Sequence, residues 1–205
     1  MKLKVCGMRE PENIKALSAL TPDYMGFIFW APSSRYVETT TIELPSAIKK
    51  TGVFVDASVD YIQSMVLQHK LQAVQLHGEE TPQYCSLVQD FSVEVIKAFS
   101  IKDSFDFSQL EPYETSCDFF LFDTKGELPG GNGYGFDWSL LTNYPSQKPF
   151  FLSGGIGLKH TSQIKALLNT DLPLHAIDVN SKFELAPALK NIDALTQFKN
   201  ELYEL

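Results

Sequence analysis

The sequence predicts a single-domain (β/α)8 TIM barrel of the α/β class that spans residues 1–205. Eight short apolar runs have the composition of β-strands, and several segments between them repeat with the period of a helix. The length of 205 residues corresponds to one domain and lies near the lower limit for such a barrel. We therefore expect one closed barrel without a second domain.

The strand candidates are rich in β-branched and aromatic residues. In order, they are LKVCG (3–7), YMGFIFW (24–30), TGVFV (51–55), AVQLH (73–77), EVIKAF (94–99), FFLFD (119–123), PFFLSG (149–154) and AIDVN (176–180). Because they are nearly continuous in apolar character, we expect them to be buried on both faces, as in a parallel sheet covered by helices. An open flavodoxin-like sheet is the alternative, but its roughly five strands would leave three of these runs unexplained.

The helix candidates lie between these runs. Five of them combine helical periodicity with capping residues: 11–20, 58–69, 81–91, 159–168 and 191–203. Three further helices are expected at 39–50, 102–113 and 137–144, where the segments are short or interrupted by proline. With these, each of the first seven strands would be followed by a helix and the last helix would close the chain.

Composition indicates a soluble globular protein. Hydrophobic residues make up 44% and charged residues 20% of the chain, the usual balance for that class. The first residues, MKLKVCGMREPEN, place polar residues directly after a four-residue apolar stretch, unlike a secretory signal. We therefore expect a cytoplasmic protein that has no membrane partner.

Charge and cysteine content exclude other classes of function. Lys and Arg together number 17 against 25 Asp and Glu, and no basic run occurs, which argues against a nucleic-acid partner. An anionic small molecule is compatible with this balance, because a helix N-terminus and local cations can bind phosphate. Cys6, Cys85 and Cys117 form an odd, scattered set without CxxC spacing, so we expect neither a disulfide framework nor a metal site.

Polar and small residues stand at the ends of the apolar runs, where barrels of this class place their active sites. They are Cys6, Arg35 in the loop after the second run, Asp56, His77, Asp123, Gly154, Gly155, Asp178, Asn180 and Ser181. The segment SGGIG (153–157) precedes a predicted helix, so its backbone N–H groups can face an anion. We expect Gly154 and Gly155, aided by Asn180 and Ser181, to bind phosphate; the alternative is an ordinary tight turn.

Cys6 and Asp123 are the candidate base and acid. In a closed ring the first strand adjoins the eighth, and the sixth adjoins the seventh. A ligand held by its phosphate over the last two strands would therefore have Asp123 on one side and Cys6 on the other, as proton transfer requires. The alternatives are a cysteine that only fills space and an aspartate that caps the following loop. A cation such as Lys4 or Arg9, if it pointed inward, would help to form the thiolate.

Nine segments, in order along the chain, resemble signatures of the phosphoribosylanthranilate isomerase family. They are KVCG (4–7), GFIF (26–29), SSRYV (33–37), GVFVD (52–56), VQLHGEE (74–80), VIKAF (95–99), FDTKGELPGGNGYGFDW (122–138), LSGGI (152–156) and IDVNSKFE (177–184). Each alone is weak, but nine in the expected order make the resemblance specific and extend it over essentially the whole chain.

The resemblance implies an Amadori rearrangement in tryptophan biosynthesis that needs no metal or organic cofactor. The substrate would be a phosphorylated sugar joined to anthranilate, with Asp123 as general acid and Cys6 as general base. Arg35 matches the arginine that binds substrate near the anthranilate end, and Asp178 would belong to the same neighbourhood. Members of the family occur as monomers or homodimers, so either state is expected here.

The chain departs from the family pattern at three positions. Lys182 stands where the family usually has Gly and could add a cation to the phosphate site or force a different turn. Asn132 and Tyr134 replace residues in the glycine-rich segment 126–136, for which a flap over the substrate and a plain turn are both open. For His77, a structural and a catalytic role are both open.

Two other functions compete with this assignment. The related aminoaldose isomerase of histidine biosynthesis also catalyses a phosphoribosyl Amadori rearrangement, but it typically has an aspartate where this chain has Cys6. A barrel that binds a phosphorylated ligand without catalysis is the other alternative, because a fold alone does not determine activity. The combination of Cys6, Asp123 and Arg35 argues against both.

Overall fold

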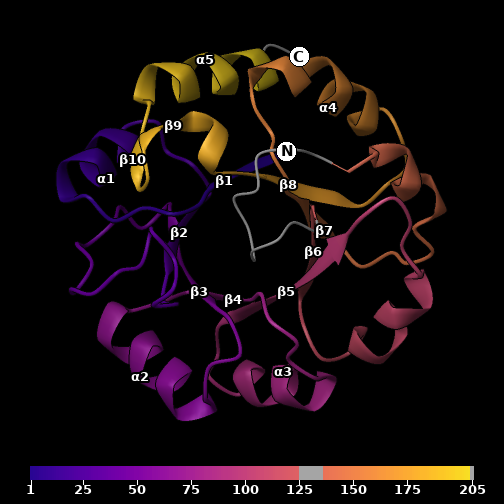
Figure 1. Cartoon of the computed structure of the whole chain (residues 1–205), viewed down its shortest axis with the longest axis horizontal. Helices are drawn as coiled ribbons and strands as arrows, with labels where there is room; N and C mark the ends of the chain where they lie inside the picture. Colours follow the sequence, from indigo (N-terminus) through magenta and orange to yellow (C-terminus); the bar gives the residue numbers. More distant parts are fainter. Residues whose placement is uncertain (125–135, 204–205) are drawn as a thin grey trace.

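The computed structural model describes residues 1–124 and 136–203, in which eight parallel strands form a closed ring (Figure 1). The strands are β1 (Lys2–Val5), β2 (Tyr24–Ile28), β3 (Lys49–Phe54), β4 (Ala73–Leu76), β5 (Glu94–Ile101), β6 (Phe119–Thr124), β7 (Phe150–Leu152) and β8 (Leu174–Val179). β8 pairs with β1, with Asp178 opposite Lys4, and this pairing closes the ring. The predicted TIM barrel is confirmed, and the open sheet is excluded.

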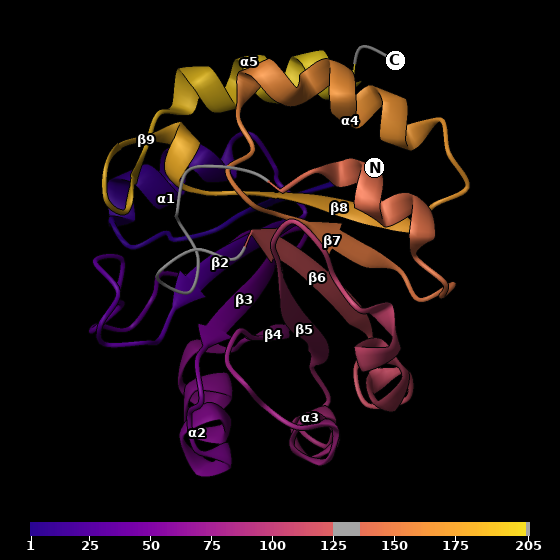
Figure 2. The same ribbon diagram turned by 45° about the vertical axis from the view of Figure 1, so that its right-hand side comes forward.

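Five α-helices lie outside the ring. They are α1 (Pro11–Ser18), α2 (Val59–His69), α3 (Pro82–Gln89), α4 (Thr161–Leu168) and α5 (Ile192–Tyr203), and each falls within a predicted helical segment. Ser58 and Thr81 cap α2 and α3 by accepting the backbone N–H groups of Tyr61 and Tyr84, which explains where these helices begin. Figures 1 and 2 show α4 and α5 side by side against the barrel.

The three helices expected in short or proline-interrupted segments are wrong as α-helices. No helix follows β2: residues 39–48 are irregular, and Lys49 and Lys50 already pair with β2 as the start of β3. Pro45 lacks an N–H group, and strand pairing takes up the last residues of that segment. In 102–113 and 137–144 the chain forms the 3-10 helices η1 (Phe107–Tyr113) and η2 (Trp138–Asn143), which are capped by Asp106 and Asp137.

Four short elements that the sequence did not predict follow β7 and β8. The 3-10 helix η3 (Leu158–His160) leads into α4. The 3-10 helix η4 (Ser181–Phe183) leads into a small antiparallel hairpin of β9 (Glu184–Ala186) and β10 (Leu189–Lys190). This hairpin lies beyond the C-terminal end of β8 and contributes buried charges to the region around Cys6.

The barrel interior is apolar at its N-terminal end and polar at its C-terminal end. Tyr24, Ala73, Ile96, Ala98, Leu121, Phe151 and Ala176 form the apolar layer. Because side chains alternate along a strand, residues two positions further share the inward face. Gln75 thus follows Ala73, Asp123 follows Leu121 and Asp178 follows Ala176, so a polar layer lies above the apolar one.

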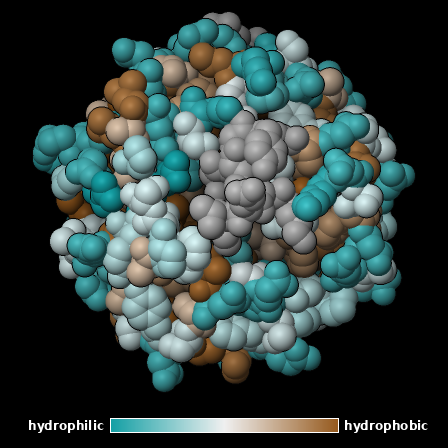
Figure 3. Space-filling view, viewed as in Figure 1, coloured by the Kyte–Doolittle hydropathy of each residue, from teal (hydrophilic) through white to brown (hydrophobic). Residues whose placement is uncertain are grey.

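Large exposed apolar side chains are dispersed over the surface. Leu67, Leu87 and Leu185 belong to α2, α3 and β9, and the hydrophobic residues visible in Figure 3 form separate groups among hydrophilic ones. Apolar residues scattered singly over a surface are normal and need no special explanation. In the described ranges, no helix combines the length and apolar character that a membrane crossing needs.

Candidate active site

A pocket opens at the C-terminal ends of the strands and brings most of the predicted site residues together. Of the described residues, its polar lining comprises Cys6, Ser33, Gln75, His77, Asp123, Ser153, Gly154, Gly155, Asp178, Asn180, Ser181 and Lys182. Its apolar lining comprises Ile28, Trp30, Val53, Val55 and Ile156. Seven of the eight residues that were given a catalytic, substrate-binding or phosphate-binding role are therefore in one pocket, and the eighth, Arg35, is outside this lining. The segment 126–135, with Asn132 and Tyr134, lies outside the described residues.

Cys6 follows β1 directly and is buried. Its backbone N–H donates to the Val179 carbonyl at 2.9 Å, which ties the residue to the end of β8. Gly26 on β2 makes room for the thiol, because a β-carbon at that position would lie 2.7 Å from the Cys6 sulfur. A larger residue at Gly26 would therefore displace the sulfur or the strand.

The charges around Cys6 oppose one another. Burial raises the pKa of the Cys6 thiol; the Lys4 ammonium lowers it, Asp178 raises it and Lys190 lowers it. The expected inward-pointing cation is therefore Lys4, whereas Arg9 points away and binds Glu10 and the Ser34 carbonyl.

Asp178 is paired with Lys4. Its Oδ1 accepts from Lys4 Nζ at 2.9 Å, and both side chains are buried. Burial raises the pKa of Asp178, although the Lys4 charge opposes this. Burial would lower the pKa of Lys4, but Asp178 and Cys6 together raise it, so the ammonium stays charged. Asp178 thus lines the pocket as part of an ion pair.

Asp123 ends the apolar run of β6 and is also buried. Its Oδ1 accepts the Thr124 backbone N–H at 2.8 Å. Its Oδ2 lies 3.4 Å from Nε2 of His77, and Nδ1 of His77 lies 2.6 Å from the Gln75 amide nitrogen. The sequence left two roles open for His77, and the structure places it beside the candidate acid.

The predicted phosphate loop has a backbone conformation that favours glycine. Gly154 and Gly155 both have positive φ angles, of 99° and 64°. A β-carbon on Gly154 would lie 2.2 Å from Thr124 Oγ1, so only glycine fits there. The Asn180 oxygen accepts from Lys190 Nζ at 2.6 Å, so a bond from Asn180 to an anion would have to come from its NH2 group.

Lys182 lines the pocket as an exposed side chain beside the glycine loop. Its β-carbon lies 3.2 Å from where a β-carbon on Gly157 would be. We expect Lys182→Gly to raise KM by up to about fivefold with a smaller change in kcat, because an exposed charge contributes about 1 kcal/mol or less to holding a phosphate. Steady-state kinetics would measure this. Lys182→Met removes the charge but keeps the backbone constraint; an unaltered KM in both variants would remove Lys182 from the phosphate site.

Arg35 is held by the hairpin that follows β8. Its guanidinium forms a bidentate ion pair with Glu184. Nε donates to Oε1 at 2.9 Å, and Nη2 donates to Oε2 at 2.6 Å. Lys190 Nζ also donates to Glu184 Oε1 at 2.6 Å. Sequence reasoning missed Glu184 and Lys190. The available signal was the end of the quoted segment IDVNSKFE, where an acidic residue follows a buried strand by a few positions.

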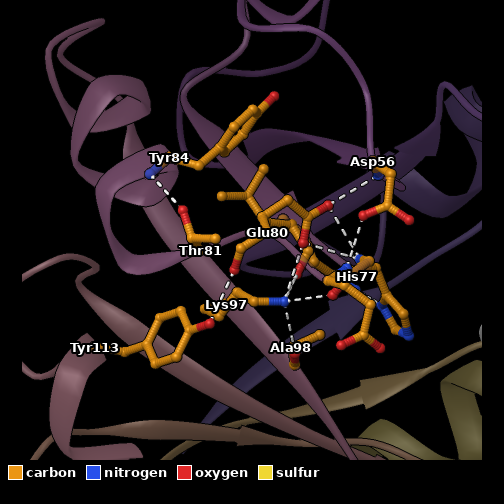
Figure 4. Close-up of polar contacts among 12 residues, drawn as sticks. Asp56, His77, Glu80, Thr81, Tyr84, Lys97, Ala98 and Tyr113 are labelled. Carbon is orange, nitrogen blue, oxygen red and sulfur yellow. Dashed lines mark hydrogen bonds and ion pairs between the residues drawn. The ribbon is translucent and has the colours of Figure 1, made fainter.

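Another buried ion pair supports the turn that carries His77 (Figure 4). Lys97 Nζ donates to Glu80 Oε2 at 3.0 Å and to the Gly78 carbonyl at 2.7 Å. The Glu80 carboxylate in turn accepts the Gly78 N–H at 3.0 Å and the Asp56 N–H at 3.0 Å. These contacts join the ends of β3 and β4 to the middle of β5, so they fix the backbone on the C-terminal side of His77.

Loss of this pair is expected to destabilise the protein strongly. Lys97 and Glu80 have side-chain exposures of 3% and 2%, and removing one partner leaves the other buried and unpaired. We expect Lys97→Met to lower the free energy of unfolding by about 3–5 kcal/mol, measured by urea unfolding. The exposed pair of Lys70 and Glu43 is the control, because Lys70→Met should leave the free energy of unfolding nearly unchanged. Equal effects of the two substitutions would contradict the prediction.

Comparison with known proteins identifies the family. Residues 3–201 match the family model described as N-(5'phosphoribosyl)anthranilate (PRA) isomerase. The chain belongs to this family. N-(5'-phosphoribosyl)anthranilate isomerases of Parabacteroides distasonis and Phocaeicola vulgatus are each 43% identical to it. These matches cover 98% of this chain in both cases, and 93% and 98% of the relatives.

Solved structures of phosphoribosylanthranilate isomerases have the same fold. The Thermus thermophilus enzyme superposes with a TM-score of 0.86 at 25% identity, covering 100% of this chain and 99% of its own. The Thermotoga maritima enzyme gives a TM-score of 0.84 at 29% identity and covers 100% of both chains. Another phosphoribosylanthranilate isomerase structure, in complex with reduced 1-(o-carboxyphenylamino)-1-deoxyribulose 5-phosphate, gives a TM-score of 0.82 at 27% identity, with 100% of both chains covered.

Membership of the phosphoribosylanthranilate isomerase family confirms the resemblance found in the sequence and favours it over the histidine-pathway isomerase. The roles of individual residues stay predictions, because the comparisons name the family and not its residues. Within the described ranges, no group of three His, Cys, Asp or Glu side chains is arranged to hold a metal ion.

Proposed function

We propose that this chain converts N-(5-phosphoribosyl)anthranilate into 1-(2-carboxyphenylamino)-1-deoxyribulose 5-phosphate, an aldose–ketose isomerisation of tryptophan biosynthesis. The observation that carries the proposal is that Cys6 and Asp123 line one pocket together with Gly154 and Gly155. A relative with the same fold binds a reduced analogue of the product, which supports a phosphorylated sugar–anthranilate ligand.

Asp123 acts as the general acid in this proposal. It protonates the ring oxygen of the sugar, and the bond between C1 and that oxygen breaks while the anthranilate nitrogen forms a C1=N double bond. The open-chain product is an iminium ion, and Asp123 is left as a carboxylate. The Thr124 N–H at 2.8 Å from Oδ1 is placed to stabilise that carboxylate.

Cys6 acts as the general base. Its thiolate removes the proton from C2, and the electrons of that C–H bond form a C1=C2 double bond while the iminium nitrogen is neutralised. The resulting enolamine tautomerises to the ketone. Lys4 and Lys190 provide positive charge near the sulfur and so favour the thiolate against the cost of burial.

The backbone around Gly154 and Gly155 holds the phosphate, with Asn180, Ser181 and Lys182 along the same side of the pocket. Arg35 and Asp178 are assigned to the anthranilate end. Because Glu184 holds the Arg35 guanidinium, substrate would have to share or replace part of that contact to bind it.

The test is a turnover assay with freshly prepared phosphoribosylanthranilate that follows the loss of its fluorescence. We expect turnover by the wild-type chain, and none with the aminoaldose of histidine biosynthesis. A purified, folded chain that turned over only the second substrate, or neither, would refute the proposed function.

The remaining assignments are predictions. We propose that residues 1–205 form one catalytic domain, located in the cytoplasm, that acts as a monomer or homodimer. No nucleic-acid partner, metal or organic cofactor is expected.

A further inference from the structure

A row of buried polar side chains crosses the barrel between the two proposed catalytic groups. Lys4 on β1 is buried outside the pocket lining, Gln75 on β4 is part of that lining, and His77 follows β4 beside Asp123. Lys4 supports the Cys6 thiolate, but the proposed reaction gives no role to Gln75 or His77. Their contacts form a series from Lys4, whose charge acts on Cys6, through Gln75 to His77, which lies 3.4 Å from Asp123.

Lys4 determines the orientation of the Gln75 amide. An ammonium group can only donate hydrogen bonds, and Lys4 is fully buried. Lys4 Nζ lies 2.7 Å from Gln75 Oε1, so the amide must turn its oxygen to Lys4. The amide NH2 group therefore has to face the opposite way, toward His77.

The amide in turn determines which ring nitrogen of His77 carries the proton. Gln75 Nε2 lies 2.6 Å from His77 Nδ1, and Nε2 is a donor, so Nδ1 must accept. A neutral imidazole has one proton, which must then be on Nε2. A doubly protonated ring would oppose its Nδ1–H to the NH2 group of Gln75.

The ring nitrogen that carries the proton is the one that faces Asp123, at 3.4 Å from Oδ2. This contact is longer than an ordinary hydrogen bond, and contacts of this kind commonly shorten when substrate binds. We propose that Lys4 and Gln75 are positioning residues that hold His77 in the tautomer whose N–H points at Asp123. The proposal deepens the proposed function and rests on it, because it assumes that Asp123 is the acid.

The tautomer matters for an acid. With its N–H toward Asp123, His77 stabilises the carboxylate that remains after the proton has moved to the sugar. In the opposite tautomer, a basic lone pair would face Asp123 and compete with the ring oxygen for its proton. A permanently charged ring would hold Asp123 as a carboxylate, which has no proton to give.

The other side of His77 is fixed independently. Its backbone N–H donates to the Phe54 carbonyl at 2.8 Å. Lys97 donates to the Gly78 carbonyl and, at 3.4 Å, to the Leu76 carbonyl. It therefore binds the backbone on both sides of His77. The backbone of His77 is thus held by β3 and β5, and the direction of its ring proton by Gln75.

The sharpest variant is Gln75→Glu, because Lys4 also faces Asp178 and is near Cys6, so replacing Lys4 would disturb the base as well. A carboxylate at residue 75 would accept from Lys4 and from His77 Nδ1–H at the same time. We expect nitrogen-15 spectra of the free wild-type enzyme at pH 7 to show the proton of His77 on Nε2. In Gln75→Glu we expect both ring nitrogens to carry protons at that pH.

The kinetic result expected for Gln75→Glu is a fall of roughly 10- to 100-fold in kcat with KM changed by less than about threefold, because the step that Asp123 performs is weakened and binding is not. Gln75→Met removes the amide with little change in volume, so His77 should populate both tautomers and kcat should fall less. Gln63→Glu on the exposed face of α2 is the matched control and should change neither the spectra nor the rate.

Two outcomes would overturn the inference: a wild-type His77 with its proton on Nδ1, or a kcat near wild type in a Gln75→Glu variant whose His77 has become doubly protonated. If Gln75→Glu fails to fold, the wild-type spectrum and Gln75→Met decide the question. The spectra need no turnover, so a wild-type chain with the expected tautomer and no activity would refute the proposed function and not the arrangement of His77.

Discussion

Asp123→Asn is expected to lower kcat by roughly 10³- to 10⁴-fold, the upper range for loss of a general acid. An amide has no proton that it can transfer to the ring oxygen, so ring opening would depend on water. An amide oxygen can still accept the Thr124 N–H that Asp123 Oδ1 accepts at 2.8 Å, and the new NH2 group then faces His77 Nε2. The loss should therefore appear in kcat and in kcat/KM alike, measured by the fluorescence assay.

Asp56→Asn is the control for this substitution. Asp56 also ends a strand of the barrel, but it is outside the pocket lining and its Oδ1 accepts the Glu79 N–H at 2.7 Å. We expect Asp56→Asn to keep the wild-type kcat, and both variants to unfold near the wild-type temperature. An Asp123→Asn enzyme that is folded and works within tenfold of the wild-type rate would show that another group is the acid.

The barrel was predictable because its eight strands are nearly continuous apolar runs with mostly helical segments between them, a pattern typical of a parallel sheet covered by helices. The run FFLFD at 119–123, for example, is apolar until it reaches Asp123, and the structure places exactly that residue at the pocket. Strand ends also located Cys6, Gly154 and Asp178, because parallel strands bring their C-terminal ends to one rim. For these positions, order along the chain determines position in space.

Tertiary contacts explain why the helices expected in the weakest segments did not form as α-helices. A helix was expected at 39–50, a short segment that contains Pro45. In the structure, Lys49 and Lys50 pair with β2 and form the start of β3 instead. In 102–113, Pro112 lies inside a 3-10 helix, whose tighter turn still allowed a capped element. Short segments of this kind follow the packing around them more than their own propensity.

The polar network was harder to predict because it depends on side-chain direction. Lys4 and Lys97 occur inside apolar strand runs, and a lysine in such a run usually extends to solvent. Alternation gave a signal, since Lys4 is two residues before Cys6 and shares its inward face. The partner Gln75 could not be identified from sequence, because its contact with Lys4 spans the ring between strands that are distant in the chain.

Cys6→Ser is expected to lower kcat by roughly 10³-fold or more, the second of the two largest effects. A hydroxyl ionises far above the ordinary thiol range of about 8.5, so it forms almost no anion at neutral pH to remove the C2 proton. Serine is slightly smaller than cysteine, so it fits in the space that Gly26 leaves for the sulfur. A β-carbon on Gly26 would lie only 2.7 Å from that sulfur. The loss should therefore come without a loss of folding.

The pH dependence of the wild-type enzyme separates this role from a structural one. Because burial raises the pKa of Cys6, with Lys4 opposing the rise, only the minor thiolate form is active at neutral pH. The ultraviolet absorbance of the Cys6 thiolate should therefore rise with pH and keep rising beyond the ordinary thiol range, about 8.5. Cys6→Ser should lack that rise, and Cys117→Ser, outside the pocket lining, should keep it. A Cys6→Ser enzyme with wild-type kcat and an unchanged pH profile would show that the sulfur only fills space and is not the base.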